Sequence, residues 1–256
     1  AIAMHNYEAA YNVFPSGSMG PMNGNNSFPT GWCDPGLGCG LPWGHFSWAA
    51  VILPFVDAAN LHEQIDFSVP AYVYSLVENG TQRGPAGHAN NMQAANSMPR
   101  VFVCPSAPRA QPETQNKDYG MNGGTGVCCP ERTQNGMQGM GFVNSAVRLA
   151  DVTDGTSNTF LLLELDHTSN HSWLNRDRGS NPFFFVHHAS EGYVDGGAVD
   201  VPDTLVYNNR AAASHHQFGV HTVFTDGHLK FLSNNIDLPT YRALFSRQGN
   251  EVVSFE

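Results

Sequence analysis

The sequence predicts one α+β domain, with a helix at the start of the chain followed by a mainly antiparallel sheet. Residues 1–14 repeat apolar positions every three or four residues, which is typical of a helix. Residues 159–165 form the most apolar run, which suits a central strand buried on both faces. Residues 220–232 place two β-rich segments around Asp226-Gly227, which predicts a hairpin. Because no repeat or linker divides the chain, residues 1–256 are expected to form a single domain.

Between the first helix and the central strand, loops and short elements are expected. Gly and Pro are plentiful, at 26 and 16 residues, and these residues favour turns. The pattern predicts a loop over 15–45, a buried strand or short helix over 46–57, a helical turn over 58–64, a helix or strand over 71–77, a short strand over 100–105, a loop over 120–141 and a helical turn over 148–154.

The central strand contains one charged residue, Glu164. A buried carboxylate needs a partner, and Arg148 is the first candidate. Two further strands are predicted over 183–188 and 199–207.

The chain closes with a hairpin and a helix. The Asp226-Gly227 dipeptide favours a type I′ turn, in which both residues have positive φ. Asp237 should cap a helix over 238–245, with Pro239 in its first turn and Gly249 ending it.

Composition excludes some classes of partner. The net charge is −10, and only 12 Lys and Arg residues are present, with no basic run. Binding to nucleic acid needs clustered cations that release counterions from phosphates, so no nucleic-acid role is expected. An anionic membrane surface is disfavoured for the same reason. No stretch reaches the ~20 apolar residues that would span a bilayer.

The five cysteines indicate an oxidising compartment. Cys33 and Cys39 bracket a Gly/Pro loop that a disulfide could close. Cys128 and Cys129 are adjacent and would bond each other only with strain, so each is expected to have a separate partner, Cys104 being one candidate. Buried free thiols are the alternative. No C-x2-C pair of the kind that holds zinc is present.

Several landmarks resemble one known family. Asp226-Gly227 follows His216 after nine residues, and the chain also contains His5-Asn6-Tyr7, Phe14-Pro15-Ser16-Gly17, Trp48 to Phe55, Cys104-Pro105-Ser106 and Arg148 to Thr159. These match the motifs of the prepilin-like DUF1559 (H-X9-DG) proteins, which are abundant in planctomycetes and related bacteria.

The resemblance implies a pilin-like plan, in which an N-terminal helix packs on an antiparallel sheet that carries large insertions. Residues 1–14 would be the end of that helix. Family members carry a prepilin leader and a hydrophobic helix upstream of the His-Asn-Tyr segment, so we expect an extracytoplasmic protein anchored by a helix that this chain lacks. They also commonly carry a cysteine just upstream, which is our candidate for a sixth cysteine.

Three sets of residues are candidate sites. In the family pattern, His216, Asp226 and Gly227 are expected to hold the closing hairpin in place. Family members often follow this histidine with Pro-Gly-Gly, whereas Gln217-Phe218-Gly219 stands here.

The other two sets are candidate metal sites. Asp151, Asp154 and Asn158 form an oxygen-rich turn that could bind calcium. His221 and His228 lie on opposite strands of the hairpin and are candidate transition-metal ligands, with His187-His188 as a further contributor.

No catalytic set is found. The chain has no Gly-x-Ser-x-Gly elbow, no phosphate-binding loop and no dinucleotide-binding glycine motif. We therefore predict a non-enzymatic structural subunit, pseudopilin-like or part of a surface filament or envelope assembly such as type II secretion or a type IV pilus. Its partners would be proteins, possible copies of itself included, and a membrane only through the missing helix.

The alternative function is an extracytoplasmic carbohydrate- or ligand-binding module. It depends on four tryptophans that could stack on sugar rings, namely Trp32, Trp43, Trp48 and Trp173.

Overall fold

A computed structural model defines the fold. It describes residues 1–20, 46–69, 76–78, 81–83, 91–95, 97–107, 117–124, 138–165, 188–189, 194–195, 198–199 and 212–251. All structural statements below concern these residues.

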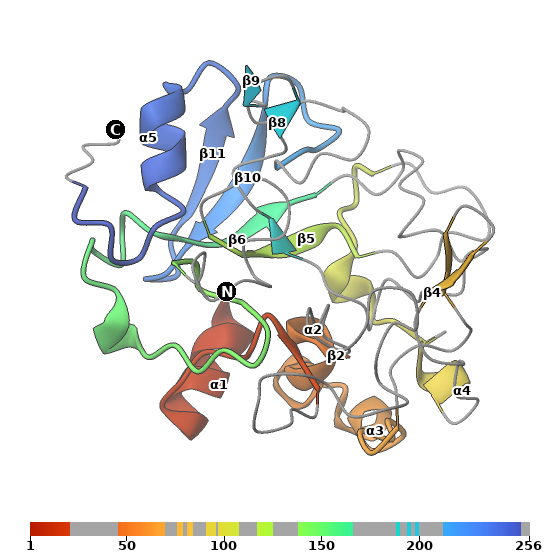
Figure 1. Cartoon of the computed structure of the whole chain (residues 1–256). Helices are drawn as coiled ribbons and strands as arrows, with labels where there is room; N and C mark the ends of the chain where they lie inside the picture. The colour runs from red at the N-terminus through yellow and green to blue at the C-terminus, as the bar shows by residue number, and fades with distance from the viewer. Residues whose placement is uncertain are drawn as a thin grey trace.

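The centre of the fold is a five-stranded sheet in the order β11-β10-β6-β5-β7 (Figure 1). Its strands are β5 (Tyr119–Asn122), β6 (Phe160–Glu164), β7 (His188–Ala189), β10 (Gly219–Phe224) and β11 (Leu229–Ser233). The pairs β11/β10, β10/β6 and β6/β5 are antiparallel, whereas β7 runs parallel to β5. The predicted α+β class is confirmed, because helices accompany this mainly antiparallel sheet.

The remaining elements are short. The helices are α1 (Ile2–Tyr11), α2 (Trp48–Val51), η1 (Leu53–Val56), α3 (Ala59–His62), α4 (Met92–Ala95), η3 (Arg100–Phe102), η6 (Leu149–Asp151) and α5 (Leu238–Ala243). The small strand pairs are β1 (Ser18–Met19) with β2 (Phe46–Ser47), β3 (Leu76–Glu78) with β4 (Thr81–Arg83), and β8 (Val194–Asp195) with β9 (Ala198–Val199). None of the helices in the described residues has the length and apolarity needed to cross a membrane.

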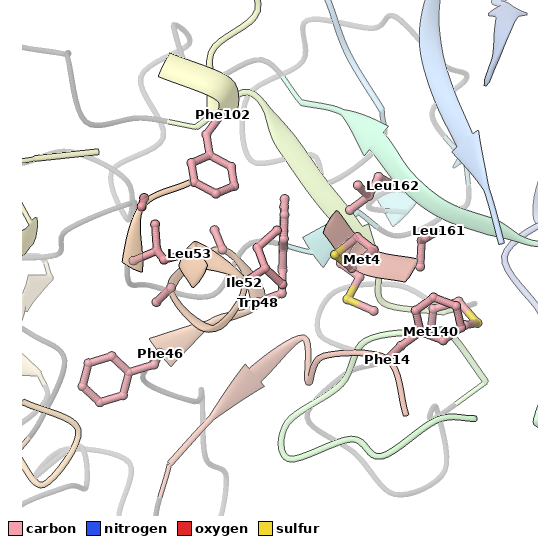
Figure 2. Packing of buried hydrophobic residues seen from close by; sticks show 14 of the residues in the cluster. Met4, Phe14, Phe46, Trp48, Ile52, Leu53, Phe102, Met140, Leu161 and Leu162 are labelled. Atoms are coloured by element: carbon pink, nitrogen blue, oxygen red, sulfur yellow. The ribbon is translucent and has the colours of Figure 1, made fainter. Parts of the chain in front are cut away.

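Strand β6 lies between two hydrophobic clusters and is buried along its whole length, as its apolar sequence predicts. Phe160 and Leu163 pack in the cluster that contains Tyr241 and Phe245, from α5 and the turn that follows it. Leu161 and Leu162 belong to the other cluster, which includes Met4 of α1 and Trp48 of α2; Figure 2 shows these side chains together.

A β-bulge explains why two consecutive leucines join the same cluster. Val223 pairs with Leu162 and Phe224 pairs with Phe160, so Leu161 is the extra residue of β6. A bulge of this kind breaks the strict alternation of a strand. It therefore lets β6 present two leucines in succession toward α1 and α2.

The closing helix forms as predicted at its start but not at its end. The Asp237 carboxylate accepts a hydrogen bond from the Thr240 backbone N–H at 3.1 Å, which caps α5. The helix ends at Ala243, well before Gly249. The Gly249 N–H instead donates to the Asp154 carboxylate at 2.6 Å, so this glycine anchors the chain that follows the helix.

The hairpin is confirmed, but the type I′ turn is wrong. Gly227 has a φ of 91°, and Asp226 is not among the described residues with positive φ. The Gly227 N–H donates to the Phe224 carbonyl at 2.9 Å and the Phe224 N–H to the His228 carbonyl at 3.0 Å. This is the three-residue loop that ends in a left-handed glycine. The Asp226 carboxylate favours it by accepting the His228 N–H at 3.1 Å.

The short strand predicted over 100–105 is also wrong, because η3 occupies its first half. Pro99 presets the φ that starts such a turn, and the Phe102 N–H donates back to the Pro99 carbonyl at 3.2 Å. The segment then extends at Val103, so that Cys104 lies outside any strand.

The structure tests several of the remaining secondary-structure predictions, some of them only in part. The segment 46–57 is mostly helical after the two residues of β2, and the predicted turns over 58–64 and 148–154 correspond to α3 and η6. Only Leu76 and Val77 of the segment 71–77 are described, and they begin β3. The loop predicted over 120–141 is wrong at its start, because residues 120–122 belong to β5 and pair with β6. Most of the strands predicted over 183–188 and 199–207, and most of the loops over 15–45 and 120–141, lie outside the described residues.

A lysine is enclosed in the core beside α2. Lys117 has no exposed surface, its Nζ donates to the Ser47 hydroxyl at 3.3 Å, and it lies 5.9 Å from the centre of the Trp48 ring. Burial away from water holds the pKa of the Lys117 ammonium well below its usual range.

This burial predicts how stability changes with pH. A free lysine has a pKa of about 10.4, so between the lowered pKa and that value the unfolded chain binds the proton and the folded chain does not. Stability should therefore rise with pH across this window, as far as the unfolded pKa. Lys117→Met should remove that rise. Chemical unfolding of both proteins from neutral pH to mildly alkaline pH measures the difference, and parallel pH profiles would contradict the prediction.

Candidate functional site

Three side chains able to bind a metal or move a proton converge at one end of β6. Cys104 Sγ lies 3.5 Å from Glu164 Oε1 and 3.7 Å from His216 Nε2, and His216 Nε2 lies 3.2 Å from Glu164 Oε1. Among the described residues, they are the one group of three or more His, Cys, Asp or Glu side chains close enough to hold a metal ion. We call Cys104, Glu164 and His216 the carboxylate cluster.

The position of Cys104 is fixed by a buried carboxylate. Its backbone N–H donates to Asp118 Oδ2 at 2.7 Å, and the Asp118 N–H donates to the Phe102 carbonyl at 2.9 Å. The Asp118 carbonyl in turn accepts the Leu165 N–H at 2.9 Å. The segment after η3 is therefore fastened to the strand end that carries Glu164.

His216 is placed by a small loop before β10. The Ser214 hydroxyl accepts the His216 N–H at 3.0 Å and donates to the Gly219 carbonyl at 2.8 Å. Hydroxyls commonly stabilise short turns in this way. The loop turns the imidazole back toward β6, and its side chain is a quarter exposed.

His221 borders the cluster from the neighbouring strand. Its backbone N–H donates to Glu164 Oε2 at 2.7 Å, and its ring Nδ1 lies 3.4 Å from the same oxygen. Its ring stands edge-on to the His216 ring, with 4.6 Å between centroids. About half of the His221 side chain is exposed, so the cluster reaches the surface here.

Burial controls the chemistry of the thiol. Cys104 and Glu164 are 6% and 4% exposed. Burial raises the pKa of the Cys104 thiol, and the nearby Glu164 and Asp118 carboxylates raise it further, against a lowering by a hydrogen bond from the Ser106 backbone. A thiol held in its protonated form is a weak nucleophile. The cluster therefore lacks the lowered thiol pKa that marks a catalytic cysteine.

The predicted partner of Glu164 is wrong. Arg148 lies at the surface and pairs with Asp151 at 2.8 Å, across the capping arrangement of η6. Glu164 is satisfied instead by the two histidines, the cysteine and a backbone N–H. Sequence distance explains the error, because His216 follows Glu164 by 52 residues.

The Asp226-Gly227 turn is fastened to the segment before β6. The Asp226 N–H donates to the Thr156 carbonyl at 3.1 Å, and the Thr225 N–H donates to the Thr159 carbonyl at 2.8 Å. A side chain at Gly227 would meet the His5 ring of α1 within 3.2 Å. His216 lies at the other end of β10 and contacts Glu164 through its ring, so the three motif residues do not form one site.

The structure does not bring His221 and His228 together. His221 pairs with Phe231 across the hairpin, whereas His228 lies at the turn, stacks on the Phe224 ring at 4.3 Å and places its Nδ1 2.6 Å from Asp226 Oδ1. The predicted pair is wrong because hairpin register puts them several residues apart. His187 and the His188 side chain lie outside what the structure describes.

The two acidic residues of the candidate calcium turn have protein partners. Asp151 bonds Arg148 through both carboxylate oxygens, which lowers the Asp151 pKa. Asp154 accepts backbone N–H groups of Gly249 and Asn250 at 2.6 and 2.8 Å. Asn158 donates its backbone N–H to Gly155 in the same turn. Calcium binding here stays a prediction.

Cys104 is a buried free thiol, so its expected disulfide is not found. Its sulfur faces Glu164 and His216, which explains why it is not paired. Cys33, Cys39, Cys128 and Cys129 lie outside the described residues. Cys104 and Glu164 were not recognised as members of one site, although a lone carboxylate in the most apolar strand was a signal that polar partners would gather there.

An open apolar groove of about 730 Å³ begins beside the cluster. The first turn of α1 lines it together with residues of α2, η1 and η3, and the sheet contributes Leu162, His221, Val223 and Leu229. In Figure 1 the N-terminus lies between α1 and the sheet. Leu229 is 69% exposed, which leaves an apolar side chain available at the rim.

Comparison with known protein families gives a match over most of the chain. Residues 1–239 match the family described as "Protein of unknown function (DUF1559)". No curated protein and no solved structure matches the chain.

Replacing the carboxylate of the cluster tests its structural importance. Glu164→Gln keeps the shape but removes the charge that strengthens hydrogen bonds from His216 and His221, and such bonds contribute about 1.5–3 kcal/mol each. We expect a loss of at least ~1.5 kcal/mol in the free energy of unfolding, measured with a chelator present so that no metal contributes. The matched control is Glu63→Gln, which makes the same change at an exposed glutamate. Equal stability of the two variants would contradict the prediction.

Proposed function

Because the chain belongs to the DUF1559 family, whose description assigns no activity, we propose a function from geometry: a non-enzymatic, pseudopilin-like structural subunit of an extracytoplasmic filament or envelope assembly. The observation that carries the proposal is the apolar groove at the start of α1. The protein would join its partners through an apolar helix, not through a reaction.

The occupant we propose is an apolar helix that continues α1 upstream of Ala1. Ala1, Ile2 and Met4 line the groove, so a continuing helix would enter it directly. A helix about 10 Å across with a pitch of about 5.4 Å fills about 420 Å³ per turn. The 730 Å³ groove therefore has room for nearly two turns.

The chemistry of the groove supports an apolar occupant. Ile2, Val101 and Leu229 line it and are all more than half exposed, and exposed apolar patches of this kind mark interaction surfaces. The sheet face behind them has Leu162 and Val223. A helix covering this surface would complete the helix-on-sheet plan that the family resemblance implies, and beyond the groove that helix would provide the membrane anchor.

The proposal that the protein is not an enzyme draws on the carboxylate cluster, the one group of three or more His, Cys, Asp or Glu side chains among the described residues that is close enough to hold a metal ion. This cluster lacks a nucleophile with a lowered pKa, since burial raises that of Cys104. The cluster therefore does not support nucleophilic catalysis by Cys104.

A ligand-binding module is the second candidate, because a groove of 730 Å³ falls in the range of small-molecule sites, about 300–1,000 Å³. Trp48 does not support a carbohydrate-binding site, because its side chain is buried in the core. Trp32, Trp43 and Trp173 lie outside the described residues.

A charge placed in the groove tests the structural proposal. Leu229→Glu should reduce recovery of the protein in a high-mass envelope complex by more than about tenfold, because a carboxylate would be buried against an apolar helix. The protein is expressed from its complete gene in its own host and the complex is measured by cross-linking and size-exclusion chromatography.

Phe218→Glu is the matched control. Phe218 is also 69% exposed but does not line the groove, so this variant should assemble normally. A wild-type protein that runs as a partner-free monomer, or equal assembly of the two variants, would reject the proposal. A groove that instead retains a small apolar molecule through purification would favour the second candidate.

A further inference from the structure

We propose that the carboxylate cluster binds one divalent transition-metal ion, with zinc as the best match, through Cys104 Sγ, Glu164 Oε1 and His216 Nε2. Three protein ligands would leave the fourth tetrahedral position for water. This inference does not depend on the proposed structural function, because it concerns different residues and a different occupant.

The distances between the three ligand atoms fit a tetrahedron. Zinc binds sulfur at about 2.3 Å, imidazole nitrogen at about 2.0–2.1 Å and carboxylate oxygen at about 2.0–2.2 Å. Tetrahedral edges from those bonds are about 3.5 Å for pairs that include sulfur and about 3.3 Å for nitrogen to oxygen. The observed separations are 3.5 and 3.7 Å for the sulfur pairs and 3.2 Å for the remaining pair.

Hydrogen bonds among the three side chains explain their close approach less completely than a bound metal ion does. The Cys104 thiol has one proton, yet its sulfur lies within contact distance of both Glu164 Oε1 and His216 Nε2. Glu164 Oε1 contacts both Cys104 and His216. Glu164 Oε2 already accepts a hydrogen bond from the His221 backbone N–H at 2.7 Å. A cation bound to the three atoms would satisfy all of them at once, and the Cys104 thiol would release its proton to solvent as the metal binds.

The cluster is held in place by a second layer of contacts. Asp118 fixes Cys104, Ser214 fixes the His216 loop, and the N–H of His221 orients Glu164. Outer contacts of this kind orient the ligands of metal sites. The three ligands come from segments 52 to 112 residues apart, so a bound ion would join the segment after η3, the end of β6 and the loop before β10.

The donor set selects the class of metal. Calcium and magnesium prefer sites built entirely from oxygen, and this cluster offers only one carboxylate. Sulfur and imidazole together with a carboxylate suit zinc, and cobalt(II) can replace zinc as a spectroscopic probe. His221 Nδ1 lies 3.4 Å from Glu164 Oε2, so its ring borders the proposed site.

The proposal is tested by titrating the metal-free protein with zinc chloride in a calorimeter and with cobalt(II) chloride in a spectrophotometer. We expect tight binding and a thiolate-to-cobalt charge-transfer band. Cys104→Ser should abolish the band that this site contributes, and both Cys104→Ser and His216→Gln should weaken zinc binding at it by more than about tenfold. Zinc should also raise the Tm of the wild-type protein, because it binds only the folded site.

The matched control is His228→Gln. His228 also lies beside a carboxylate, with Nδ1 2.6 Å from Asp226, but has no described cysteine in reach. It should keep the cobalt band and the zinc affinity. Thermal unfolding verifies that each variant is folded. The proposal is overturned if the wild-type protein shows no thiolate band, or if folded Cys104→Ser and His216→Gln variants bind zinc as the wild type does.

Discussion

The buried carboxylate of Glu164 is the interaction on which one end of the fold depends. It lies in the central strand with a side chain that is 5% exposed, and a charge so buried is tolerated only when it is fully paired. Its oxygens receive contacts from a cysteine, two histidines and a backbone N–H. These partners come from three other segments, so satisfying one charge fixes the positions of all of them.

Much of the sheet that carries this carboxylate could be predicted from the sequence because its signals are local, whereas β5 falls at the start of a segment predicted as a loop. Five apolar residues within 159–165 identify β6, the Asp-Gly pair identifies the hairpin, and Asp237 with Pro239 identifies the start of α5. The sequence predictions are wrong where hydrogen bonds to other residues outweigh the local conformational preference of the segment. Asp226 avoids positive φ because its carboxylate binds the next residues of the turn, and the segment after Pro99 forms a 3₁₀ turn because Cys104 bonds Asp118 instead of a strand.

The site could be predicted only in pieces. Cys104 and His216 each stood out as part of a motif, and Glu164 stood out as a charge in an apolar strand. Nothing in their spacing shows that they meet, because the loops between them set their approach. The same reasoning explains the wrong histidine pair: counting residues suggested that His221 and His228 face each other, whereas register places Phe231 opposite His221.

His221 connects the two surfaces for which we propose functions. It lines the apolar groove, while its N–H and Nδ1 contact Glu164 of the carboxylate cluster. An occupant of the groove would therefore press on the residue that orients the carboxylate, and a metal held by that carboxylate would stiffen one wall of the groove. Assembly and metal binding would then be coupled in both directions, since any linkage of binding free energies is reciprocal.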